Sequence, residues 1–334
     1  MQSLERSVDA IARQTTFSGV VRVDRGEETT LAKAYGLAHR GYEIPNTIDT
    51  QFGIASGTKG LTAATVVSMI VDGSLERSTT ARSVLGADLP LINDDVTVEL
   101  LLSHRSGIGD YLDEETDLDI TDYLLPVPTH ELATTEEYVA VLDGHSSKFA
   151  PGERFAYCNS GYVVLALIAE RVGGEPFPEL VRRRVCEPAQ MDATEFVRAD
   201  ELPGRAAVGY LANDGTRTNV FHLPVRGSGD GGIFSTVADL SSFWRAFFAD
   251  QIVPASWVTE MTRGRGDTGR ESSGYGLGFW LREASGVVLL EGCDAGVSFR
   301  SVHDRKRQMT HTVISNTAAG AWPIARLLQE QLET

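Results

Sequence analysis

The stretch QFGIASGTKGLTAATVVSMI, residues 51–70, joins a short β-like run to an apolar run long enough for a helix. The apolar pattern predicts a helix from Gly60 to Asp72, with Ser56 at its entry and Lys59 three residues further on. Side chains three residues apart on a helix share one face. The sequence therefore predicts that a serine hydroxyl and a lysine amine point into the same space.

This pair of side chains fits nucleophilic catalysis. A serine hydroxyl is a weak nucleophile until a base takes its proton, and a lysine amine can do so where burial or a nearby cation makes the neutral amine accessible. At a helix N-terminus, the N–H of Ser56 would also face a developing oxyanion. The alternative is a serine that only caps the helix and an exposed Lys59, because Ser-x-x-Lys is a short pattern.

A second motif, Tyr157-Cys158-Asn159, lies between the turn sequence PGERF and the apolar run SGYVVLALIAE. A tyrosine hydroxyl there can relay protons if an ammonium group is near, and an asparagine amide can bind a substrate carbonyl. The alternative is a tyrosine packed on the core and an asparagine that caps the next helix. Cys158 is expected to point away from both, since neighbours in an extended segment alternate sides.

Strand-like runs gather at the two ends of the chain and helical patterns in the middle. Amphipathic helices are expected at the start and at residues 321–332, and strands beside them. The pattern predicts an α+β fold, with an antiparallel sheet flanked by N- and C-terminal helices and an inserted, mainly helical domain. A cleft is expected at the seam. The expected strands are 17–24, 29–36, YGLGFWLRE, GVVLLEG, VSFRSVHD and QMTHTVISN, and the middle helices are 60–72, 134–142, 161–171 and 237–248.

The domain organisation follows from this pattern. Residues 1–334 are expected to form one unit, in which 1–55 and 272–334 build the sheet region and 56–271 the mainly helical region. No repeat or low-complexity linker interrupts it. The acidic run Asp113 to Asp122 is interpreted as a solvated loop, with the rim of an active site as the alternative.

Composition excludes several classes of partner. Acidic residues exceed basic ones by 16, so the surface should repel nucleic acid and anionic membranes. No run is apolar enough to span a bilayer, and the start lacks the apolar core of a secretion signal, which predicts a cytoplasmic protein, or a secreted or periplasmic one whose signal was removed. The three cysteines and the histidines match no metal motif, so no metal and no cofactor is expected. The expected partner is a small-molecule substrate, and the oligomeric state stays open.

Both motifs and their flanks resemble the serine β-lactamase and penicillin-binding-protein superfamily, which includes class C β-lactamases, D-Ala-D-Ala carboxypeptidases and family VIII esterases. The resemblance covers nearly the whole chain and implies a similar fold. It also implies a serine hydrolase in which Ser56 is acylated and Lys59 and Tyr157 handle protons. The further passages that carry it are LLSHRSGI (101–108), PGERFAYCNSGY (151–162), GDGGIFSTVADL (229–240) and YGLGF (275–279).

The third motif of this superfamily, Lys-Thr-Gly or His-x-Gly on a strand, is expected at Cys293-Asp294-Ala295. This departure removes a cation, and Asp294 adds negative charge if it faces the site. Cys293 is expected to be a structural thiol. The small residues Ala295 and Gly296 leave room for a substrate backbone, and the N–H of Gly296 is the expected second oxyanion donor.

The expected substrate contacts are therefore Asn159 and residues 293–296. Because the cation of the third motif is missing, a small ester or amide is favoured over a carboxylate-bearing β-lactam, within the esterase, β-lactamase or D-amino-acid peptidase types. The alternatives are a penicillin-binding or scaffold protein without turnover and an acyltransferase that uses the same serine. His104 and Arg105 are expected to support the cleft wall.

Overall fold

A seven-stranded antiparallel sheet organises the part of the chain that this computed structural model describes, residues 2–115, 119–269, 273–282 and 284–333. The strand order is β2-β1-β11-β10-β9-β8-β7, so the first strand pairs with the last one. This confirms the predicted α+β fold. The strands are β1 (Gly19–Arg25), β2 (Glu28–Tyr35), β7 (Gly274–Tyr275), β8 (Trp280–Arg282), β9 (Val287–Asp294), β10 (Val297–Asp304) and β11 (Met309–Ser315), with short pairs β3 (Leu37–His39) and β4 (Ile44–Pro45), and β5 (Phe52–Gly53) and β6 (Phe234–Ser235).

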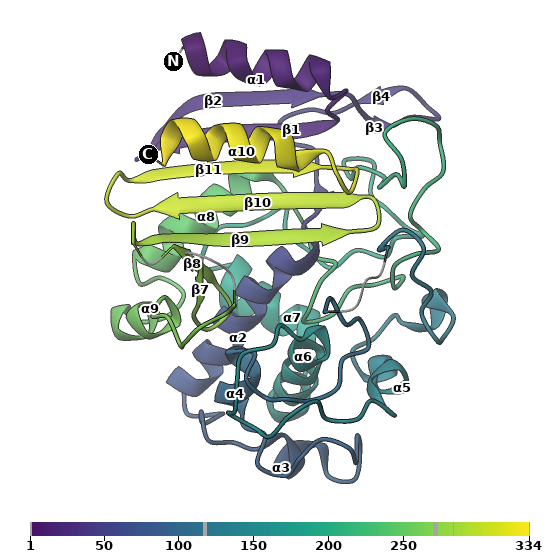
Figure 1. Cartoon of the computed structure of the whole chain (residues 1–334), viewed down its shortest axis with the longest axis vertical. Coiled ribbons are helices and arrows are strands. Elements are labelled where there is room, and N and C mark those ends of the chain that lie inside the picture. Colours follow the sequence, from purple (N-terminus) through teal and green to yellow (C-terminus); the bar gives the residue numbers. More distant parts are fainter. Residues whose placement is uncertain (1, 116–118, 270–272, 283, 334) are drawn as a thin grey trace.

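Two helices, α1 (Gln2–Gln14) and α10 (Ala321–Leu332), cover one face of the sheet (Figure 1). Alternate residues of a strand point to opposite faces. Accordingly Val21 packs in the core under α1 and α10, whereas its neighbour Val20 packs in the core on the other side. The sheet is therefore buried on both faces.

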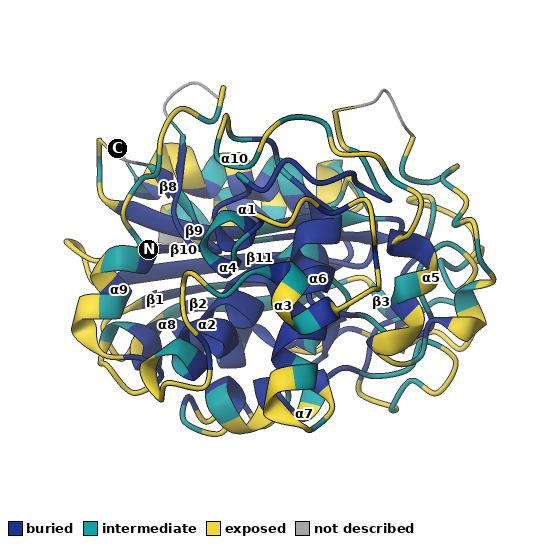
Figure 2. Ribbon diagram, turned by 90° about the horizontal axis from the view of Figure 1, so that it is seen from below, coloured by how far each residue is buried: buried dark blue, intermediate teal, exposed yellow. Residues whose placement is uncertain are grey.

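The helical half packs against the second face of the sheet and extends beyond it (Figure 1). Figure 2 shows α2 and α6 buried along most of their length, whereas α3, α7 and α9 carry exposed faces. No helix of the described residues is both long and apolar enough to cross a membrane. The helices are α2 (Thr58–Val71), α3 (Ala81–Leu85), α4 (Val98–Leu102), α5 (Val139–Leu142), α6 (Asn159–Gly173), α7 (Phe177–Val181), α8 (Val237–Phe248) and α9 (Ala255–Met261), with 3-10 turns at Ala55–Gly57, Thr129–Glu131 and Glu136–Tyr138 and a π turn at Arg182–Cys186.

Most predicted helices are present, and one is much shorter than expected. The helices predicted at 237–248 and 321–332 have those bounds. The helix predicted at 134–142 is a 3-10 turn followed by the single turn α5. The backbone N–H groups of Ala133 and Thr134 bond to the Glu137 carboxylate, so these two residues lie in the loop before the 3-10 turn.

Close packing explains the two glycines of the passage YGLGF (275–279). A Cβ built on Gly276 would lie 2.0 Å from the carbonyl oxygen of Met261, at the end of α9. One built on Gly278, which has a φ of +90°, would lie 2.3 Å from the Cβ of Ala63 in α2. Both glycines allow the turn between β7 and β8 to lie directly on two helices.

Gly276→Ala is expected to destabilise the fold by about 1–3 kcal/mol, because the new methyl group meets backbone that cannot move freely. Urea unfolding measures this. The control is Gly161→Ala in α6, where a Cβ would meet its nearest atom at 3.6 Å and helix propensity should give a small gain. Equal stability changes in the two variants would contradict the packing argument.

Candidate active site

Ser56 lies in the 3-10 turn Ala55–Gly57, immediately before α2. The turn is preceded by β5, and Ala55 has a φ of +45°, in the left-handed region. Such a conformation is unusual for a residue with a side chain and is found where the surrounding structure enforces it. The turn presents the Ser56 hydroxyl to a pocket while Ala55 and Gly57 stay buried.

Lys59 is 1% exposed, which excludes the alternative of a helix-capping serine followed by an exposed lysine. Its Nζ lies 2.9 Å from Ser56 Oγ, 2.8 Å from Asn159 Oδ1 and 2.7 Å from the carbonyl oxygen of Asp230. The last two atoms can only accept hydrogen bonds. A neutral amine that donates its two protons to them would therefore turn its lone pair toward the serine hydroxyl.

Asn159, the first residue of α6, uses its whole carboxamide inside the protein. Its oxygen accepts from Lys59, and its Nδ2 donates to the carbonyl of Leu112 at 2.8 Å and to Glu114 at 3.3 Å. These contacts position the lysine. A contact with the substrate stays a prediction.

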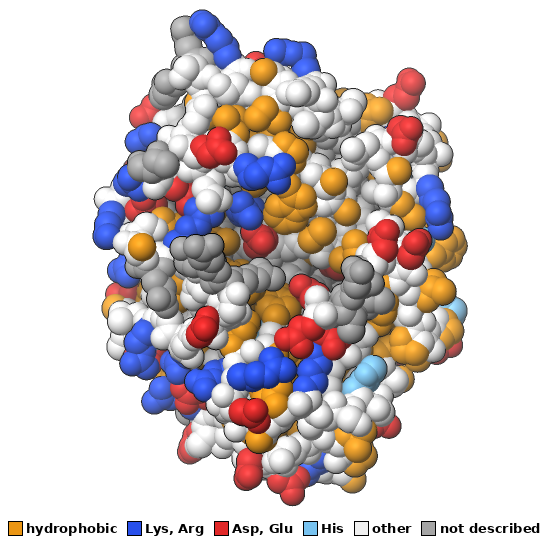
Figure 3. All heavy atoms as spheres, viewed as in Figure 1, with side chains coloured by type: hydrophobic (Ala, Val, Ile, Leu, Met, Phe, Trp, Pro, Cys, Tyr) orange, Lys and Arg blue, Asp and Glu red, His pale blue; other side chains and the backbone are white. Residues whose placement is uncertain are grey.

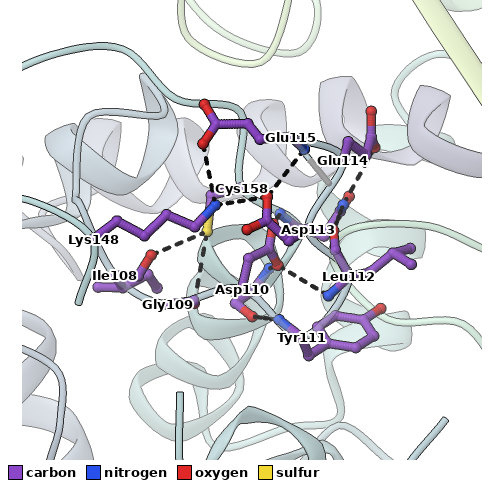
Figure 4. A network of polar contacts seen from close by, with 12 residues as sticks. Ile108, Gly109, Asp110, Tyr111, Leu112, Asp113, Glu114, Glu115, Lys148 and Cys158 are labelled. Carbon is purple, nitrogen blue, oxygen red and sulfur yellow. Dashed lines mark hydrogen bonds and ion pairs between the residues drawn. The ribbon is translucent and has the colours of Figure 1, made fainter. Parts of the chain in front are cut away.

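Asp110 holds the start of α6. Its carboxylate accepts the N–H groups of Asn159 and Ser160, both at 2.8 Å, and thus caps the helix from a distant loop. Burial raises the pKa of Asp110 to about 6. Figure 4 shows this loop, with the thiol of Cys158 directed to the carbonyls of Ile108 and Gly109. The expectation that Cys158 points away from the site is confirmed.

Tyr157 is partly buried beside Ser56, in a small pocket that also includes Trp280. Burial, and next the negative charge of Glu114, hold the pKa of Tyr157 well above its usual value, while a hydrogen bond with Ser56 opposes them. The phenol is therefore neutral in the free protein. Lys59 Nζ lies over the ring of Tyr157, 4.9 Å from the ring centroid, and the ring stacks on Trp280.

His104 supports the wall of the site, as expected. Its Nδ1 accepts the N–H of Cys158 at 3.0 Å, and its Nε2 lies 3.1 Å from the hydroxyl of Tyr275. Burial, and next the positive charge of Lys59, hold the pKa of His104 well below its usual value. It is a neutral hydrogen-bonding group that fixes the segment from Tyr157 to Asn159. Arg105 donates to the carbonyl of Gly152 at 2.6 Å.

Strand β9 approaches Ser56 at Gly292, which precedes the predicted Gly296 in the chain. A Cβ built on Gly292 would lie 2.8 Å from the nitrogen of Ser56 and 2.3 Å from the carbonyl oxygen of Ile54. Gly296 instead lies in the β9–β10 turn, has a φ of +72°, and faces the backbone of Gly209 and Tyr210. Gly292, and not Gly296, is thus the glycine that packs against the turn of Ser56, and the oxyanion role of the Gly296 N–H stays a prediction.

The other residues of the expected third motif face different parts of the structure. Asp294 and Gly296 line the large pocket with Ser56, whereas Cys293 lines the small pocket. Burial and the charge of Asp294 raise the pKa of the Cys293 thiol to about 12, which fits a structural thiol. Ala295 is fully buried, and its carbonyl accepts from Asn219 at 2.8 Å.

The large pocket has a volume of about 330 Å³ and opens beside Ser56. Its walls come from the sheet edge, the loops before β6 and the acidic run. Glu114 and Ile120 of this run line the pocket, beside the flanking Leu112 and Tyr123. The interpretation of the run as a purely solvated loop is therefore wrong, and the alternative of a pocket rim holds for these two residues; residues 116–118 lie outside the described part. Figure 3 shows a hollow on this face with hydrophobic side chains around it.

Three functional positions escaped the sequence argument: Asp110, Asp230 and Gly292. Asp110 and Asp230 stand in the glycine-flanked passages GIGDY and GDGGIF, which are the available signal. Tyr111 donates to the Asp230 carboxylate at 2.5 Å, and Thr62 in α2 donates to the carbonyl of Gly229 at 2.6 Å. These bonds fix the loop whose backbone oxygen holds Lys59.

A serine hydroxyl and a buried lysine amine, set at the start of a helix beside an antiparallel sheet, define a serine hydrolase of the acyl-enzyme class. The family model described as Beta-lactamase matches residues 4–332, and the chain belongs to this family. It is similar to the crystal structure of a penicillin-binding protein from Bacillus halodurans, with a TM-score of 0.90, 30% identity, and coverage of 96% of this chain and 99% of that one.

Two curated relatives extend the comparison. A putative penicillin-binding protein, PbpX, from Bacillus subtilis (strain 168) is 26% identical over 279 residues, which cover 82% of this chain but 64% of the relative. Esterase EstB from Burkholderia gladioli is 27% identical over 316 residues, which cover 83% of this chain and 77% of the esterase. The chain thus spans about two thirds of PbpX and more of EstB.

Gly292→Ala is expected to lower kcat/KM for ester hydrolysis by about 100-fold, because its methyl group would push the turn that carries Ser56 out of place. Initial rates and a melting curve measure this. The matched variant Gly204→Ala, whose Cβ would meet nothing within 4 Å, should behave as wild type. Retained activity in Gly292→Ala would show that β9 does not set the position of the serine.

Proposed function

We propose that the protein hydrolyses a small ester or amide through an acyl-serine at Ser56. The observation that carries this proposal is the placement of Lys59 Nζ at 2.9 Å from Ser56 Oγ, with its other two partners limited to accepting. Lys59 takes the hydroxyl proton as Oγ bonds to the acyl carbon. Tyr157, neutral in the free protein, then passes a proton to the leaving oxygen or nitrogen and is reprotonated from Lys59.

The oxyanion is held by two backbone donors in this proposal, the N–H of Ser56 and that of Cys293. Residues Asp294 and Val297 close a two-residue hairpin, so they form a hydrogen-bonded pair and the next pair, Cys293 with Ser298, does not. The Cys293 N–H therefore points to the outer edge of β9. Strand β8 pairs with β9 only as far as Leu289, which leaves this edge open next to Gly292.

Deacylation follows the same path in reverse. A water molecule attacks the acyl carbon, its proton passes to the Lys59 and Tyr157 pair, and the bond between the acyl carbon and Ser56 Oγ breaks. The proton returns to Oγ, and the acid product leaves. The two groups share one proton path, so a pH profile reports them as a pair.

The pocket supports an ester or amide rather than a substrate held by its carboxylate. Among the described residues that line the large pocket, none is a lysine or arginine, and three are the acids Glu114, Asp230 and Asp294. An anionic substrate would be repelled there. The naming of the Burkholderia gladioli relative as an esterase supports the same choice. The net charge of −16 supports a small molecule over nucleic acid as partner.

Ser56→Ala is expected to abolish release of p-nitrophenol from p-nitrophenyl butyrate, a loss of at least about 10³-fold in kcat, because no other group can form the acyl intermediate. The control is Ser68→Ala in α2, whose hydroxyl donates to the carbonyl of Thr65 and accepts from Arg184 and does not line the pocket. Mass spectrometry of the wild type with a slow ester should show the acyl group on the peptide that holds Ser56. Undiminished hydrolysis by Ser56→Ala would refute the proposal.

A further inference from the structure

The carboxylate of Asp294, the last residue of β9, faces the pocket but has no role in the proposed reaction. It lies on the same face of the strand as Gly292, and it lines the pocket with Ser56. A Cβ built on Gly231 would lie 3.7 Å from Asp294 Oδ2 and 3.6 Å from the carbonyl oxygen of Ala55. The carboxylate is thus close to the residue that precedes the nucleophile.

The Asp294 side chain is half-buried, and within the described part of the chain neither a hydrogen-bond donor nor an ion-pair partner contacts it. Its acidic neighbours differ from it. The Asp230 carboxylate accepts from Tyr111 and Glu114 accepts from Asn159. A half-buried carboxylate that faces a pocket and has no partner in the protein points to a ligand that supplies the donors.

The side-chain oxygen of Asn316 gives a second and independent indication that the pocket binds a ligand with hydrogen-bond donors. Asn316 is 2% exposed and lines the same pocket. Its Nδ2 donates to the carbonyls of Leu37 and Val208, each at 3.0 Å, whereas its Oδ1 has no hydrogen-bond partner in the described structure. Among its described residues, the pocket therefore has two acceptors without donors: the Asp294 carboxylate at the end of β9, and the Asn316 side-chain oxygen immediately after β11.

We propose that Asp294, assisted by Glu114, binds a protonated amine on the acyl part of the substrate. The substrate class would then be esters or amides of amino acids with a free amine. The inference rests on the proposed acyl-serine reaction, because it places the amine next to the acyl carbon that Ser56 attacks. Apolar walls from Leu223, Val225 and Phe234 suit an apolar side chain on the same substrate.

The test compares two ligands that differ only in the amine: leucine amide, in both enantiomers, and 4-methylpentanamide. Each competes with p-nitrophenyl butyrate at pH 7.0, where the α-amine is mostly protonated. At least one enantiomer of leucine amide should show an inhibition constant at least about tenfold lower than that of the neutral amide, an expected size for one ion pair in a pocket.

Asp294→Asn should reduce this ratio to about one, and Glu114→Gln should reduce it in part. The control for a general change in charge is Asp113→Asn, in the same loop as Glu114 but paired with Lys148 at 2.7 Å and outside the pocket lining. It should keep the wild-type ratio. A wild-type ratio of one for both enantiomers, or an unchanged ratio in Asp294→Asn, would overturn the inference.

Failure of this inference and failure of the proposed function give different results. Ester hydrolysis without preference for the amine would leave the acyl-serine reaction intact and remove the amine site. If the wild type did not hydrolyse the ester, thermal shift with the same two amides would still test the amine site. Preferential stabilisation by leucine amide would then support the binding site without the reaction.

The pH dependence of stability gives a readout without substrate. Burial, and next the charge of Asp230, raise the pKa of Asp294 to about 7, with Glu114 adding to the rise and Lys59 opposing it. Because this pKa lies above the unfolded value near 3.9, the ionised form is disfavoured in the folded state. Stability therefore falls as pH rises from about 4 to about 7, and the cost is complete above that range.

Asp294→Asn should remove this cost, so its melting temperature should exceed that of the wild type by about 2 °C or more at pH 8 and by less at pH 5. Leucine amide should narrow the difference at pH 7, because it stabilises only the protein with the carboxylate. A variant less stable than the wild type at pH 8 would show that Asp294 is already satisfied in the free protein, contrary to the inference.

Discussion

The burial of the Lys59 amine is the constraint on which the rest of the site depends. An amine removed from water needs hydrogen-bond partners, and here they come from three separate parts of the chain: Asn159 and the backbone of Asp230 accept from Lys59 Nζ, and the Ser56 hydroxyl lies 2.9 Å from it. Loss of either acceptor would leave a buried donor without a partner. The start of α6 and the loop before β6 are therefore fixed against α2 by the same group that activates the serine.

The sheet supplies the second half of this arrangement. Strand β9 reaches the turn of Ser56 because Gly292 has no side chain, and the same 3-10 turn approaches β10 because Gly57 has none; a Cβ on Gly57 would lie 2.4 Å from the ring of Phe299. Close approach of backbone to backbone fixes positions more firmly than side-chain contact, since backbone cannot change rotamer. The antiparallel pairing of β1 with β11 joins the chain ends and leaves the helical half as one long insertion.

The sequence could predict what is local and not what depends on pairing between distant segments. Ser56 and Lys59 are three residues apart on one turn of helix, and Tyr157 and Asn159 precede an unmistakable apolar helix, so their spacing predicted the geometry. Gly292 could not be chosen over Gly296, because one ends a strand-like run and the other precedes the next run, and only the position of β9 in the sheet shows which of them approaches Ser56. Asp110 and Asp230 act through backbone contacts with partners 49 and 171 residues away, which no local pattern records. The acidic run was misjudged because charge predicts solvent exposure in general but not which side chains turn inward to line a cavity.

The pocket carboxylates also show why stability alone does not explain this sequence. A neutral side chain at position 294 would spare the folded protein the cost of a second acid beside Asp230, and a cation there would offset the charge directly. The chain keeps neither. Proteins tolerate such local destabilisation where a ligand relieves it, because the free energy withheld from folding then appears as binding energy. If the pocket binds an amine as proposed, the absence of a lysine or histidine from Cys293-Asp294-Ala295 and the presence of Asp294 act in the same direction, because both disfavour a carboxylate and favour a cation.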